Sequence, residues 1–184
     1  DMPPAQIAGY VANLDAMYHQ LCTLFSIPKD TNIWVGKCPV FCFLNREHFA
    51  QFEAQFMGTP DTQGIAGLNH QYGDGKVATA VHRGNDPVFF AAVLVHETAH
   101  GFLHRIRSSG RIPPWMNEGI SEWIAQVVVP QSDHVANRFA TALPQLRATG
   151  SLGGDFLDES GRLESWQYGV AATLTQFLLA TDAN

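Results

Sequence analysis

The strongest structural signal in the sequence is a helix that begins at Asp86-Pro87. Aspartate suits the N-cap position, and proline at the first helical position loses no hydrogen bond. An uninterrupted apolar run, residues 88–95, follows at once. The pattern predicts one helix that continues to about Arg107, with residues 108–110 closing it.

The pattern on either side of this helix predicts an α+β fold. Further helices are expected over residues 4–25, 46–57, 114–127, 132–147 and 164–180, and strands over residues 32–35, 39–44 and 76–82. Residues 69–75 have the composition of a turn. Because strands concentrate before residue 83, we expect one domain, 1–184. An N-terminal α/β lobe with a small mixed sheet (1–86) would pack on a mostly helical lobe (87–184).

Composition excludes some classes of partner. Hydrophobic residues make up 46% of the 184 residues, which is enough for a core, and the formal net charge is −6. No run of lysine or arginine is present, so we expect no nucleic-acid partner. No apolar run approaches the roughly 20 residues of a membrane span. The first residues, Asp1-Met2-Pro3-Pro4, do not resemble a signal peptide, and the last ones fall inside a helical pattern, so we expect a mature or excised fragment.

The three cysteines leave two interpretations open. Cys38 and Cys42 lie in a strand-like run in which four residues span about 13 Å, which is too far to bridge. Either could pair with Cys22, which would slightly favour an exported protein. The alternative is that all of them are buried free thiols.

The predicted central helix contains His96-Glu97-Thr98-Ala99-His100, an H-E-x-x-H sequence. Four residues along a helix amount to about 400° and 6 Å, so both imidazoles leave the same face one turn apart. Both can then reach a single zinc ion at about 2.0–2.1 Å. Glu97, about 100° away, can reach a water on that metal. The neighbouring residues are uncharged, as a buried helix requires. Two histidines and a glutamate in such surroundings need a compensating charge, which a metal ion would supply.

A catalytic zinc needs a third protein ligand. His104 continues the same face but lies about 6 Å further along the helix, so it would miss the metal. Leu103 and Ile106 stand where the metzincin motif has glycine and histidine, so the metzincin class of zinc site is excluded. The remaining candidate is Glu118, in the segment Trp115-Met116-Asn117-Glu118-Gly119-Ile120-Ser121-Glu122.

The H-E-x-x-H sequence followed by N-E-G-x-S-E resembles the gluzincin metallopeptidases. Over residues 88–127 it is most similar to bacterial domains called peptidase-MA-like. The resemblance implies a zincin-like fold and one Zn²⁺ per chain, held by His96, His100 and Glu118, with Glu97 as catalytic base. It also implies that Glu122 hydrogen-bonds a ligating histidine from behind, most readily His96, and that Asn117 is a further residue around the ligands.

Tyr168, in Trp166-Gln167-Tyr168-Gly169, begins the late helix that such domains share. The resemblance implies that its hydroxyl stabilises the developing oxyanion. Tyr72, His82 and His134 are weaker candidates for this role. The resemblance further implies that the strand 76–82 is an edge strand that pairs with substrate. M1-type aminopeptidases, a related group, bind the free amino end of a substrate with a Gly-x-Met-Glu-Asn motif. This motif is absent from the sequence, so exopeptidase activity has no support.

These features predict a zinc metallopeptidase that acts on peptides or proteins. Two alternatives stay open. The chain could be a catalytically weak zincin-like module with a binding or structural role, although the intact Glu97 argues against it. It could also be a zinc hydrolase of a non-peptide amide or ester, because the chemistry is shared.

Overall fold

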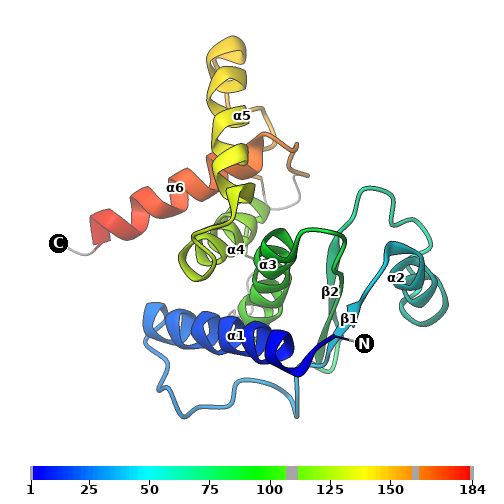
Figure 1. The fold of residues 1–184 in the computed structure, drawn as a ribbon. Helices are drawn as coiled ribbons and strands as arrows, with labels where there is room; N and C mark the ends of the chain where they lie inside the picture. The colour runs from blue at the N-terminus through cyan, green and yellow to red at the C-terminus, as the bar shows by residue number, and fades with distance from the viewer. Residues whose placement is uncertain (1, 107–111, 159–161, 183–184) are drawn as a thin grey trace.

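The computed structural model describes residues 2–106, 112–158 and 162–182. The elements follow the order α1 (Pro4–Leu24), β1 (Val40–Phe43), α2 (Arg46–Phe52), the π-helix η1 (Glu53–Met57), β2 (Gly67–Gln71), β3 (Val77–His82), α3 (Pro87–Ile106), α4 (Pro114–Val128), α5 (Asp133–Thr149) and α6 (Gln167–Asp182) (Figure 1). This α+β layout confirms the predicted fold class, with all three described strands before residue 83 and four described helices after it.

Helix α3 begins as predicted. The Asp86 carboxylate accepts hydrogen bonds from the backbone N–H groups of Val88 (2.8 Å) and Phe89 (3.0 Å), which satisfies donors that the first turn leaves unpaired. The predicted end, Arg107 with residues 108–110, lies outside the described residues.

The sheet has the strand order β1-β3-β2, with β1 parallel and β2 antiparallel to β3. The central strand is therefore β3, and the prediction that residues 76–82 form an edge strand is wrong. Its residues Val77 to Val81 are all buried, as a strand flanked on both sides requires. The edge strand next to α3 in space is β2.

The turn predicted over residues 69–75 is wrong in its first part, because residues 69–71 belong to β2. Glycine and asparagine are poor strand formers, but the partner strand and the packing on α3 override that preference. At Gly67, an added Cβ would lie 2.6 Å from Val81 Cγ1 and 2.8 Å from Glu97 Cγ, so the close approach of β2 to α3 needs a glycine. The reversal itself is shorter and closes with the Tyr72 N–H bonded to the Lys76 carbonyl (2.9 Å).

Residues 32–35, predicted as a strand, form an irregular segment instead. Their polar groups find other partners than a sheet. The Ile33 N–H donates to the Tyr18 hydroxyl (3.2 Å), and Arg105 Nε donates to the Ile33 carbonyl (2.9 Å). The Trp34 ring then packs edge-on against Phe102 of α3. The strand-forming residues here therefore make contacts from a loop and do not pair as a strand.

Helix α3 is the centre of the molecule (Figure 1). It contacts α1, α4 and the strands β2 and β3, and most of its residues from Phe90 to Leu103 are buried. Packing on several sides explains why the first half of this helix, residues 88–95, is apolar all round. The site residues on α3 are therefore held by the core of the fold.

Helices α4, α5 and α6 pack closely at two glycines. A Cβ added to Gly119 would lie 2.6 Å from the Ala171 carbonyl oxygen of α6. One added to Gly169 would lie 2.4 Å from the Arg138 carbonyl oxygen of α5. These contacts fix α6 against α4, which carries Glu118. None of the described helices combines the length and apolarity needed to cross a bilayer.

The three cysteines, Cys22, Cys38 and Cys42, are all free thiols. Of the two interpretations left open by the sequence, the structure supports the unpaired one. Cys22 is buried, and the other two are half-buried.

Candidate metal centre

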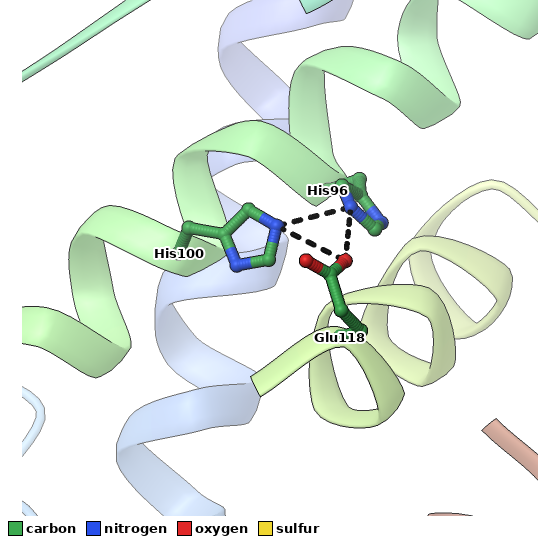
Figure 2. A group of neighbouring side chains, drawn as sticks. All are labelled: His96, His100 and Glu118. Carbon is green, nitrogen blue, oxygen red and sulfur yellow. Dashed lines mark hydrogen bonds and ion pairs between the residues drawn. The ribbon is translucent and has the colours of Figure 1, made fainter. Parts of the chain in front are cut away.

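His96 and His100 lie on consecutive turns of α3 and point the same way (Figure 2). Their Nε2 atoms are 3.1 Å apart, and both side chains are largely buried. This is the geometry that the H-E-x-x-H spacing predicts.

Glu118 reaches the same point from the beginning of α4 (Figure 2). Its Oε2 atom lies 3.3 Å from His96 Nε2 and 3.4 Å from His100 Nε2. Although this oxygen is buried, it accepts no hydrogen bond of ordinary geometry from any described residue. A buried acceptor without a donor needs a compensating group. The cluster of His96, His100 and Glu118 could hold a metal ion.

The outer ring nitrogens of both histidines face side chains of α4. His100 Nδ1 lies 3.1 Å from Ser121 Oγ, and Ser121 is fully buried. His96 Nδ1 lies 3.7 Å from Glu122 Oε1, which is beyond hydrogen-bond distance, so the two groups interact here as neighbouring charges. At His100, donation from Nδ1 to the Ser121 hydroxyl favours the tautomer that leaves Nε2 free for a metal. Asn117, beside Glu118, lies near His100.

The charges of this cluster support one another. Burial alone would raise the pKa of Glu118, but His100 and His96 outweigh it and hold that pKa well below its ordinary value. Burial alone would lower the pKa of His100, but the Glu118 carboxylate raises it to about 9. The pKa of His96 is raised in the same way, mainly by Glu122. The carboxylates therefore make this pocket a favourable place for positive charge.

Glu97 lies outside the cluster of three but lines the same pocket, where it is half-buried. Burial raises the pKa of its carboxyl group, although His96 and His100 act in the opposite direction. Gly67 of β2 packs directly on its side chain. The carboxylate of Glu97 thus lies in the same pocket as the three possible ligands but is not one of them.

The pocket has a volume of about 600 Å³ and is bordered by β2 with the loop before it, by α3 and by the helical half of the chain. Tyr168, at the start of α6, lines it together with Glu97 and Glu118. Burial, and then the charge of Glu118, raises the pKa of Tyr168 to about 12, so its hydroxyl is a hydrogen-bond donor at neutral pH.

Of the three weaker candidates for the oxyanion hydrogen bond, only one lines the pocket. Tyr72 bonds Met57 Sδ (3.4 Å), and His82 lies 3.3 Å from the Ile65 carbonyl oxygen; neither lines the pocket. His134 of α5 does line it. His104 is not part of the cluster of three, as its spacing predicts.

Sequence reasoning did not assign a role to Ser121 or Arg138. Ser121 stands three residues after Glu118, on the same face of α4, so helical spacing alone could have found it. Arg138 stands four residues after His134 on α5, and its guanidinium lies 2.7 Å from Glu122 Oε1. A basic residue on a helix gives no sequence signal for such a contact.

Comparisons with protein-family models, with curated proteins and with solved structures gave no match to this chain.

Proposed function

We propose that the chain is a zinc-dependent peptidase, with zinc held by His96, His100 and Glu118. The observation that carries this proposal is the convergence of three ligand atoms at separations of 3.1, 3.3 and 3.4 Å. Bonds of about 2.0–2.1 Å in a tetrahedron put neighbouring ligand atoms about 3.3–3.4 Å apart. The three atoms thus match one face of a tetrahedral zinc site, which leaves the fourth position for water or substrate.

The donor set also favours zinc. Two imidazoles and one carboxylate are the ligands of several catalytic zinc sites, whereas calcium and magnesium prefer oxygen alone. Among residues 2–106, 112–158 and 162–182, His96, His100 and Glu118 form the single group of three or more potential metal ligands, so we expect one zinc per chain. When bound, zinc would lower the pKa of its water and polarise a substrate carbonyl.

The chain's own residues supply the proton transfers. Glu97, which lines the same pocket, would take the proton of the attacking water and return it to the leaving amine. Burial raises its pKa, which suits a carboxylate that must hold a proton briefly. Tyr168, protonated at neutral pH, can donate a hydrogen bond to the carbonyl oxygen as negative charge develops there.

The edge strand β2 supports an extended peptide as substrate. It pairs with β3 on one side only, and residues 67–69 and 71 line the pocket. A substrate backbone can add to such an edge through main-chain hydrogen bonds, which are independent of its sequence. This role replaces the one expected for residues 76–82.

The test combines metal analysis with cleavage of a mixed peptide substrate by the wild type and by Glu97→Gln. We expect one zinc in both proteins and a loss of hydrolysis by about 10²–10⁴-fold or more in the variant. Removal of zinc with a chelator should abolish wild-type cleavage, and added zinc should restore it. Glu47→Gln, at an exposed position on α2, serves as the control.

Two results would overturn this proposal. Loss of zinc from Glu97→Gln would make Glu97 a ligand and not the base. Hydrolysis of esters or non-peptide amides, with every peptide left intact, would favour the alternative substrate class.

A further inference from the structure

Arg138 of α5 lines the same pocket, but the proposed chemistry does not use it. Its Nε atom lies 2.7 Å from Glu122 Oε1 and 3.2 Å from His134 Nε2. Its Nη1 atom donates to the Ser165 carbonyl oxygen at 3.4 Å. The guanidinium carbon also lies 4.3 Å from the centre of the Tyr168 ring. One side chain on α5 thus joins α4, α6 and the segment before α6.

The first of these contacts concerns a buried charge. The Glu122 side chain has no exposed surface, and three basic side chains surround its Oε1 atom: His96 at 3.7 Å, His134 at 3.6 Å and Arg138 at 2.7 Å. Of the three, only Arg138 carries a permanent positive charge. An ionised carboxylate buried without a partner is costly, so Arg138 favours the charged form of Glu122.

The second contact holds the tyrosine. A guanidinium 4.3 Å from a ring centre is in cation–π range, and its flat shape covers one face of the ring. The backbone fixes this arrangement, because an added Cβ at Gly169 would lie 2.4 Å from the Arg138 carbonyl oxygen. Helices α5 and α6 therefore touch at the position where the side chain of Arg138 meets Tyr168.

We propose that Arg138 is a positioning residue that couples the carboxylate behind His96 to the tyrosine across the pocket. Through Glu122 it sets how firmly His96 is presented to a metal. Through the ring of Tyr168 it sets where the hydroxyl points. The second link rests on the proposed function of Tyr168, whereas the first requires only that the cluster binds a metal.

The two links predict different results for two substitutions. Arg138→Gln removes the charge and the stacking. Arg138→Lys keeps the charge, and hence a partner for Glu122, but loses the planar group over Tyr168. Arg138→Lys is also the variant expected to fold, since it leaves no buried carboxylate without a cation. Arg147→Gln, at an exposed position on the same helix, is the matched control.

Zinc affinity tests the first link. In competitive titration with a chelator, Arg138→Gln should weaken zinc binding by about 10–100-fold, the usual cost of losing support for a ligand, and Arg138→Lys by much less. In a Glu122→Gln background the same substitution should have almost no further effect, because its partner is gone. If Arg138→Gln binds zinc as tightly as Arg147→Gln does, the first link is refuted.

Fluorine NMR of the protein labelled with 3-fluorotyrosine tests the second link without any activity. The chain has four tyrosines, and Tyr168→Phe identifies the resonance of Tyr168. Arg138→Lys should shift that resonance and leave the other three in place. An unmoved Tyr168 resonance would refute the second link.

Kinetics then connects the second link to catalysis. Loss of one oxyanion donor costs about 10²–10³-fold in kcat. At saturating zinc, Arg138→Lys should lower kcat by less than this, because the hydroxyl is displaced and not removed. It should lower kcat no further in a Tyr168→Phe background, and losses that multiply would contradict the coupling. If the wild type cleaves no peptide while the zinc and fluorine results hold, the proposed function fails and the positioning role of Arg138 stands.

Discussion

The assignment of Glu118, and not Glu122, as the third ligand gives the sharpest prediction. The two carboxylates stand one turn apart on α4, so a comparison of Glu118→Gln with Glu122→Gln changes the same group at two positions. Glu118 Oε2 lies 3.3 and 3.4 Å from the inner nitrogens of the two histidines. Glu122 Oε1 lies 3.7 Å from the outer nitrogen of His96, on the far side of that ring.

These positions set the expected magnitudes. A protein zinc site of four ligands is worth about 10–16 kcal/mol, so one ligand contributes about 2.5–4 kcal/mol, or about 10²–10³-fold in affinity. Loss of a group that only supports a ligand costs about 10–100-fold. Glu118→Gln should therefore weaken zinc binding about tenfold more than Glu122→Gln does.

Competitive titration against a chelator of known affinity measures both variants on one scale. Circular dichroism should first establish that each variant is folded, because Glu122 is fully buried and its loss can also cost stability. Equal affinities, or a larger loss in Glu122→Gln, would refute the assignment and make Glu122 the ligand.

Three further predictions concern Tyr168, Gly67 and the cysteines. Tyr168→Phe should lower kcat by about 10²–10³-fold with zinc content and KM little changed, and an unaltered kcat would remove Tyr168 from the mechanism. Gly67→Ala should reduce hydrolysis while zinc stays bound, because its Cβ would lie 2.8 Å from Glu97 Cγ, whereas Gly73→Ala meets nothing within 4 Å and is the control. The thiols should react slowly: burial raises the pKa of Cys38 to about 11, so its alkylation at pH 8 should be about 10²-fold slower than that of a free thiol and should accelerate as the pH rises. Alkylation of all three cysteines only after unfolding, without reductant, would agree with free thiols, and fewer than three would indicate a disulfide.

The helices and the pair of histidines could be predicted because their signals are local. Asp86 caps α3, and the spacing of His96 and His100 places both imidazoles on one face. Helical geometry needs no knowledge of the rest of the chain. Glu118 depended instead on how α4 returns to α3, which periodicity does not determine. Only the exclusion of the other candidate ligands and the resemblance of its motif pointed to it.

The errors have the opposite cause, since they concern segments whose structure is set by distant partners. Residues 32–35 are rich in strand formers but bond to Tyr18 and Arg105. Residues 69–71 belong to β2 because they pair with β3, and their polar composition resembles a turn when the partner strand is unknown. Arg138 lies far along the chain from Tyr168, and nothing near it in the sequence reveals that its guanidinium covers that ring.

A crystal structure of the zinc-loaded protein, with diffraction data collected on both sides of the zinc absorption edge, tests the central claim most directly. We expect one anomalous peak per chain, about 2.0–2.1 Å from Nε2 of His96, Nε2 of His100 and Oε2 of Glu118. The position opposite these three ligands should face the pocket that Glu97 and Tyr168 line. A peak at any other group of residues, or no peak after incubation with excess zinc, would contradict the account.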